Sequence, residues 1–98
     1  ADFRGFRPQR RIQGDFFSLS LTSASDGRTK CACVVSKKAS ARATIRNLIK
    51  RRCREALRSQ MSGLKKPLTL VFYAKKEAAG ALYAEIEKDI RKLLTQLR

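Results

Sequence analysis

Alternating hydrophobic and polar residues mark the first clear element of the chain, where Phe17, Leu19 and Leu21 are separated by small polar residues. A period of two is typical of a β-strand with one face on the core. Residues 23–28 have the composition of a turn, and the stretch from Thr29 to Val35 is a second predicted strand. We expect these two strands to pair as an antiparallel hairpin across the turn.

The second half of the chain shows helical and continuously apolar patterns. Ser40 is placed to cap a helix running from about residue 41 to residue 59. The stretch from Leu68 to Ala74 is apolar almost throughout, which is typical of a central strand covered by helices on at least one face. A closing amphipathic helix is indicated by apolar residues at spacings of three and four: Leu82, Ile86, Ile90, Leu93, Leu94 and Leu97. The pattern predicts a single α+β domain.

Positive charge is concentrated in the middle of the chain. The 98 residues contain 23 Lys and Arg against 8 Asp and Glu, a formal net charge of +15. Residues 27–76 carry +14 of it, whereas residues 1–26 carry +1 and residues 77–98 are neutral. The middle section also has strong apolar periodicity, so we interpret it as a folded element with a charged face. Such an imbalance favours a polyanionic partner, and nucleic acid is the first expectation.

The sequence has no His and three Cys. The lack of His excludes His general bases, Cys-His dyads and nearly every common zinc-site composition. Cys31 and Cys33 would lie on one face of a strand, and we interpret them, with Cys53, as buried thiols in a reducing compartment. No apolar run approaches the roughly 18 residues of a membrane span, and no signal-peptide core is visible, so we expect a soluble cytoplasmic protein without a membrane partner.

The predicted basic helix carries cations at four-residue spacing. The row consists of Arg42, Arg46, Lys50, Arg54 and Arg58, with Asn47 and Arg51 beside it; the packed side would hold Ala41, Ile45, Leu48, Ile49 and Ala56. Neighbours in the row lie about 6 Å apart, close to the phosphate spacing of an RNA strand. Like charges at this spacing destabilise a free helix, and Glu55 is its only acid. This favours polyanion binding over a merely solvated face.

A specific motif surrounds this row. Ser36-Lys37-Lys38, Ala43, the run from Arg46 to Arg51 and Arg54-Glu55 resemble the signature of the bacterial ribonuclease P protein subunit family, S-K-K followed by A-V-x-R-N-R-x-K-R-x-x-R-E. The resemblance extends more weakly over residues 1–98. It implies the order α-β-β-β-α-β-α, a four-stranded mixed sheet of ribosomal-protein type and a left-handed βαβ crossover. Because the sequence pattern of the family's first helix is already in progress at Ala1, we expect this helix to be incomplete.

The resemblance also implies a function. The chain would be the RNA-binding subunit of a ribonucleoprotein endonuclease that removes the 5′ leader of precursor tRNA. Its partners would be ribonuclease P RNA, with one protein per RNA, and precursor tRNA. Hydrolysis would use Mg²⁺ held mainly by RNA, so that this chain binds no metal tightly and supplies no catalytic residue.

The resemblance carries over Arg46, Asn47, Lys50, Arg51 and Arg54 by position, with Lys37 and Lys38 bordering the same surface; Arg42 is added from the basic row and Arg52 from the departure described below. The expected contacts to the catalytic RNA are Lys37, Lys38, Arg42, Arg46, Asn47, Lys50, Arg51, Arg52 and Arg54. The expected contacts to the tRNA leader are Phe3, Phe16, Ser18 and Ser20. The chain departs from the signature at Leu48, where the family has its second Arg, and at Arg52, where the family is usually apolar. We hypothesise that the cation has moved by one turn and reaches the same RNA.

Three other classes of function compete with this interpretation. A structural RNA-binding protein of ribosomal type would need the same basic helix. An RNA-recognition motif is less favoured because Arg4-Gly5-Phe6 continues as Arg7-Pro8. A stand-alone nuclease is least favoured, because ion pairs explain the spacing of the helical carboxylates Glu55, Glu85, Glu87 and Asp89.

Overall fold

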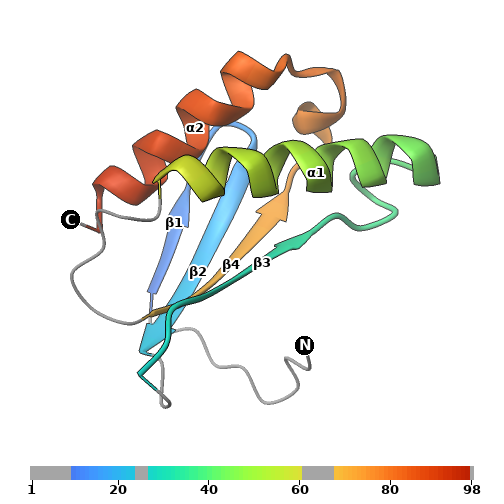
Figure 1. Ribbon diagram of the computed structural model, residues 1–98. Helices are drawn as coiled ribbons and strands as arrows, with labels where there is room; N and C mark the ends of the chain where they lie inside the picture. Colours follow the sequence, from blue (N-terminus) through green and yellow to red (C-terminus); the bar gives the residue numbers. More distant parts are fainter. Residues whose placement is uncertain (1–9, 24–26, 61–67, 98) are drawn as a thin grey trace.

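The computed structural model describes residues 10–23, 27–60 and 68–97. The elements are β1 (Arg10–Gln13), β2 (Phe17–Ser23), β3 (Lys30–Val34), α1 (Ala43–Gln60), β4 (Leu68–Ala74), a short 3₁₀ helix η2 (Lys76–Gly80) and α2 (Tyr83–Thr95). Both α1 and α2 lie on the same face of the sheet (Figure 1). The expected first helix falls in residues 1–9, outside the described residues.

The four strands form one mixed sheet in the order β1-β2-β4-β3. Strand β4 is antiparallel to β2 and parallel to β3, and α1 connects β3 to β4 in the expected left-handed crossover (Figure 1). The predicted hairpin between β2 and β3 is therefore wrong, because β4 lies between them. Leu70, Val71 and Phe72 of β4 are buried, whereas β3 is half-exposed, so the more apolar strand takes the central position.

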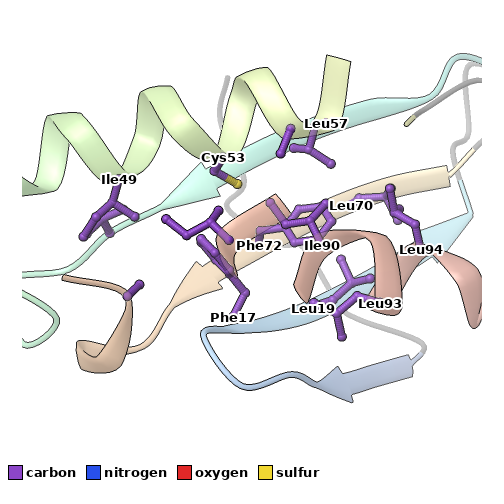
Figure 2. Close-up of a cluster of buried hydrophobic side chains, with 14 of the residues drawn as sticks. Phe17, Leu19, Ile49, Cys53, Leu57, Leu70, Phe72, Ile90, Leu93 and Leu94 are labelled. Carbon is purple, nitrogen blue, oxygen red and sulfur yellow. The ribbon is translucent and has the colours of Figure 1, made fainter. Parts of the chain in front are cut away.

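The core lies between the sheet and the two helices (Figure 2). Phe17 and Phe72 meet edge to face, with ring centroids 6.5 Å apart, and both are fully buried. The helices contribute Ile49, Cys53, Ala56 and Leu57 from α1 and Ile86, Ile90, Leu93 and Leu94 from α2. Burial of this stripe holds α1 against the sheet, and its opposite side faces solvent.

Leu82 does not belong to the packed face of α2, in contrast to the expectation from its spacing. Its side chain is 68% exposed. The residue precedes the helix as its N-cap, and its backbone N–H donates to Glu85 Oε1 at 2.9 Å. The helical period begins one residue later, which explains why Leu82 is out of register with the core.

A buried carboxylate joins α2 to the turn between β1 and β2. Asp89 is only 3% exposed and lies on α2. Its oxygens accept the backbone N–H groups of Asp15 at 2.8 Å and of Phe16 and Phe17 at 3.0 Å. The expectation that an ion pair explains Asp89 is therefore wrong. The carboxylate replaces water for three donors that no strand partner satisfies, and it fixes where β2 starts.

A substitution at Gly14, in the turn between β1 and β2, tests this packing. A Cβ added at Gly14 would lie 2.7 Å from both Asp89 carboxylate oxygens and 2.9 Å from the Phe17 carbonyl oxygen, whereas one at Gly80 meets nothing within 4 Å. We expect Gly14→Ala to lower the free energy of unfolding by about 1–3 kcal/mol. Gly80→Ala is the matched control and should change it by less than about 0.5 kcal/mol. Equal stability of the two variants in urea unfolding would contradict the observed packing.

Candidate nucleic-acid interface

Helix α1 is built much as its pattern predicts. The Ser40 hydroxyl oxygen accepts the backbone N–H of Arg42 at 3.3 Å, and the helix runs from Ala43 to Gln60. Ala41, predicted on the packed side, is exposed because it precedes the helix. Lys37 and Lys38 are exposed in the segment that leads from β3 into α1. One side of the helix is anchored, so the positions of its outward side chains are set by the core.

The outward side of α1 is strongly basic. Arg51, Arg54 and Arg58 are exposed there together with Asn47, and we call these four residues the cationic face. Arg42 is exposed just before the helix, and Lys50 is half-buried at its edge. The only acid of α1 is Glu55. The structure thus brings three of the nine predicted RNA contacts, Asn47, Arg51 and Arg54, to one exposed side of α1, with Lys50 at its edge.

Two of the predicted contacts have a different environment. Arg46 is half-buried, and its guanidinium donates to the carbonyl oxygens of Ser40 at 2.9 Å and Ala41 at 3.0 Å. Arg52 is also half-buried, on the other flank of the packed stripe, and donates to the carbonyl oxygen of Ala81 at 3.0 Å. These bonds hold α1 to its own N-terminal loop and to the start of α2.

The change from half-buried to exposed side chains along the row follows from helix geometry. Four residues advance an α-helix by slightly more than one turn, so a row at this spacing rotates by about 40° per step. The row therefore begins beside the packed stripe at Arg46 and reaches solvent at Arg54 and Arg58. RNA contact by Arg46 and Arg52 stays a prediction.

The contact of Arg52 with Ala81 has a measurable consequence. Arg52→Leu should lower the free energy of unfolding by about 1 kcal/mol, which corresponds to a fall in Tm of roughly 4–8 °C. Arg51→Leu, at an exposed neighbouring position, should leave Tm within about 2 °C. If Arg52 has also taken over the role of the Arg absent at Leu48, Arg52→Leu weakens RNA binding and Leu48→Arg restores it. An unchanged Tm for Arg52→Leu would argue against the structural contact.

The predicted leader contacts do not share one surface. Ser18 and Ser20 lie on the sheet face opposite the helices, where they pair in register with Tyr73 and Val71 of β4. Ser18 is half-buried, and Ser20 is only 3% exposed. Phe3 lies outside the described residues.

Phe16 is separated from the two serines. It packs against the core and lines a hollow of about 310 Å³ together with Glu85, Lys88 and Lys92 of α2. Because β2 begins at Phe17, Phe16 belongs to the turn held by Asp89 and does not follow the alternation of the strand. Contact of Phe16 with the leader stays a prediction.

Sequence reasoning missed two exposed side chains on that sheet face. Tyr73 of β4 is 40% exposed and Val34 of β3 is 38% exposed, and the two are register partners. The apolar run of β4 made Tyr73 resemble a core residue. The alternation of the strand could have identified it. Tyr73 is one residue from Phe72 and three from Leu70, both fully buried, so its side chain lies on the opposite face of the sheet.

Three of the carboxylates on α2 have structural partners, and the contacts of Asp89 are described above. Glu87 forms the expected ion pair with Arg91 at 2.6 Å, and Glu85 accepts the N–H that begins α2. Within residues 10–23, 27–60 and 68–97 there is no group of three or more His, Cys, Asp or Glu side chains that could hold a metal ion. In the same ranges, no helix combines the length and the apolar character needed to span a membrane.

Solved structures share this architecture. The RNase P protein of Staphylococcus aureus superposes with a TM-score of 0.78 at 20% identity, over 89% of this chain and 79% of that chain. The RNase P protein of Thermotoga maritima superposes with a TM-score of 0.79 at 20% identity, over 91% of this chain and 84% of that chain. These similarities support the fold.

Sequence comparisons identify the family. The family model described as Ribonuclease P matches residues 1–98. The Ribonuclease P protein component of Picosynechococcus sp. (strain ATCC 27264 / PCC 7002 / PR-6) is 30% identical over 96 residues, which cover 97% of this chain and 83% of that protein. That of Pseudanabaena sp. (strain PCC 6903) is 33% identical over 89 residues, covering 90% and 77%. The signature around α1, the mixed sheet and these matches agree, and the chain belongs to the ribonuclease P protein component family.

Proposed function

We propose that this chain binds the RNA of ribonuclease P through the cationic face of α1 and through Lys37 and Lys38, and so promotes removal of the 5′ leader from precursor tRNA. Proteins of this family are part of an endoribonuclease holoenzyme. The observation that carries the proposal is the exposed row of Arg51, Arg54 and Arg58 on a helix whose other side is buried. Rigid placement lowers the entropy lost when side chains bind phosphates.

The charge distribution supports RNA as the partner. Arginine presents a fork of donors that matches phosphate oxygens, and three exposed arginines of α1 lie within two turns of helix. Each phosphate contact releases a counterion, so affinity should depend steeply on salt. The folded position of these cations favours a structured RNA over a flexible polyanion.

For the leader, we propose the sheet face opposite the helices, with Tyr73 as the stacking residue and Ser18 beside it. A base stacked on an aromatic ring contributes about 1–3 kcal/mol and requires no particular sequence. Leaders that differ in sequence can therefore bind the same ring. The expected roles of Phe3 and Phe16 stay predictions.

Tyr73 provides a direct test of this leader site. Tyr73→Ala should weaken binding of precursor tRNA to the holoenzyme by roughly 5- to 100-fold, whereas Tyr73→Phe should retain it, because stacking needs the ring and not the hydroxyl. Mature tRNA, which lacks the leader, is the control substrate. Equal losses for precursor and mature tRNA would contradict a leader contact at this ring.

We further propose that hydrolysis uses Mg²⁺ held mainly by the RNA. The part of this chain is to bind and orient: its arginines neutralise phosphates of the catalytic RNA and its sheet face positions the leader. Asp89, Glu85 and Glu87 have backbone or arginine partners, which is in keeping with this division of roles. Cytoplasmic location and one protein per RNA stay predictions.

Reconstitution tests the proposal. The chain is mixed with a bacterial ribonuclease P RNA and precursor tRNA at low Mg²⁺. Correct 5′ cleavage above the rate of either component alone is the expected result. Failure to stimulate any bacterial ribonuclease P RNA, together with tight binding to ribosomal RNA, would overturn the proposal in favour of a ribosomal role.

A further inference from the structure

Two cysteines from different elements meet under the basic helix. Cys33 of β3 and Cys53 of α1 place their sulfur atoms 2.6 Å apart. Cys53 is fully buried and projects from α1 into the core (Figure 2), and Cys33 is half-buried. Cys31 lies on the same face of β3 as Cys33 but is exposed, so the expectation of three buried thiols was wrong for this residue. The edge position of β3 explains its exposure.

We propose that Cys33 and Cys53 form a site of reversible thiol–disulfide exchange, at which a small-molecule disulfide oxidises the pair and joins β3 covalently to α1. A disulfide requires two side chains that converge, with an S–S bond of about 2.05 Å. Here the two sulfur atoms already face each other across the contact between strand and helix. Bond formation therefore needs only a small shift of side chains.

Cys33 is the thiol that reacts first. The hydrogen bond between the Cys33 and Cys53 side chains, opposed by burial and aided by the positive charges of Arg54 and Lys50, lowers the pKa of Cys33. Partial burial and the neighbouring Cys33 raise the pKa of Cys31 to about 11. The thiolate is the nucleophile in exchange, so Cys33 should react ahead of Cys31 at neutral pH despite its smaller exposure.

The exchange is balanced in two steps. The Cys33 thiolate attacks one sulfur of the oxidant, whose S–S bond breaks and releases one thiolate that takes up a proton. Cys53 then loses its proton to solvent, attacks the Cys33 sulfur and releases the second thiolate, which is also protonated. The protein pair loses two electrons and two protons, and the oxidant takes up both to become two thiols.

The local contact also favours the second step. The hydrogen bond between the Cys53 and Cys33 side chains is the main cause that raises the pKa of Cys53. In the mixed disulfide, Cys33 carries neither a thiol proton nor a negative charge and forms this hydrogen bond poorly, so the cause is removed when Cys53 must ionise. The resulting bond encloses residues 33–53, which include Lys37, Lys38 and the first half of α1. Oxidation thus restrains the segment that carries Lys37, Lys38 and Arg51, three of the proposed RNA contacts.

Oxidised glutathione is the probe for this site. The full chain is incubated with it, quenched with an alkylating reagent, digested and analysed by mass spectrometry. We expect one Cys33–Cys53 cross-linked peptide with two hydrogens lost, and Cys31 alkylated. We expect Tm to rise by roughly 10 °C, because the cross-link restricts the unfolded chain, and dithiothreitol should reverse the rise.

Serine variants separate this pair from the third cysteine. Cys31→Ser should keep both the cross-link and the rise in Tm, whereas Cys33→Ser and Cys53→Ser should each abolish both. Cys33 is half-buried, so its variant tests the pair even if serine at the buried Cys53 prevents folding. Pairing of Cys31 with either partner, a glutathione adduct at Cys31 alone, or an unchanged Tm after cross-linking would overturn the proposal.

Discussion

Replacing Arg51 and Arg54 together by alanine is expected to weaken binding to ribonuclease P RNA by roughly 50-fold at about 0.1 M salt. Both guanidiniums are exposed on the cationic face. Each lost phosphate contact removes the release of about one counterion, so the plot of log K against log salt should become less steep by about two. The parent chain, with roughly six to eight contacts, should show a slope of about −4 to −7.

A matched variant distinguishes the effect of charge at specific positions on α1 from the effect of the total charge of the protein. Lys88→Ala with Lys92→Ala removes the same two charges from exposed positions of α2. We expect its affinity to fall by less than about threefold, since only long-range attraction is lost. Both double variants should keep the parent's stability within about 0.5 kcal/mol, because all four side chains are exposed. Equal loss of affinity in the two variants would refute docking on α1.

The largest effect on stability is expected at Asp89. Asp89→Ala should lower the free energy of unfolding by about 3–5 kcal/mol, a large part of the 5–15 kcal/mol typical of a small domain. The change removes the acceptor of the Asp15, Phe16 and Phe17 N–H groups, which lie beside the core and gain no other described partner. Asp89→Asn, which keeps one acceptor oxygen, should cost about half as much.

Glu87 is the control for this effect. It lies on the same helix two residues earlier, and its carboxylate pairs with Arg91, whose side chain is 61% exposed. An exposed ion pair contributes little, so Glu87→Ala should cost less than about 1 kcal/mol. Urea unfolding of the three variants measures these costs. Similar midpoints for Asp89→Ala and Glu87→Ala would show that the buried carboxylate does not anchor the turn.

Local patterns were sufficient for the elements and the family. The apolar run from Leu68 to Ala74 coincides with β4, and the predicted basic helix agrees with α1 within two residues at each end. A strand or helix period depends on neighbouring residues only, so it can be seen in the sequence. The signature from Ser36 to Glu55 likewise indicates the family, because the order and spacing of its residues are properties of the sequence alone.

Long-range packing decided the strand order and the contacts between elements. The place of β4 between β2 and β3, the three N–H groups on Asp89 and the meeting of Cys33 with Cys53 all join residues 20 or more positions apart. Such contacts depend on which apolar faces are buried together, and no local period encodes them. The same packing turned Arg52 toward the carbonyl oxygen of Ala81 and left Arg51 and Arg54 in solvent, although all three are arginines of one helix.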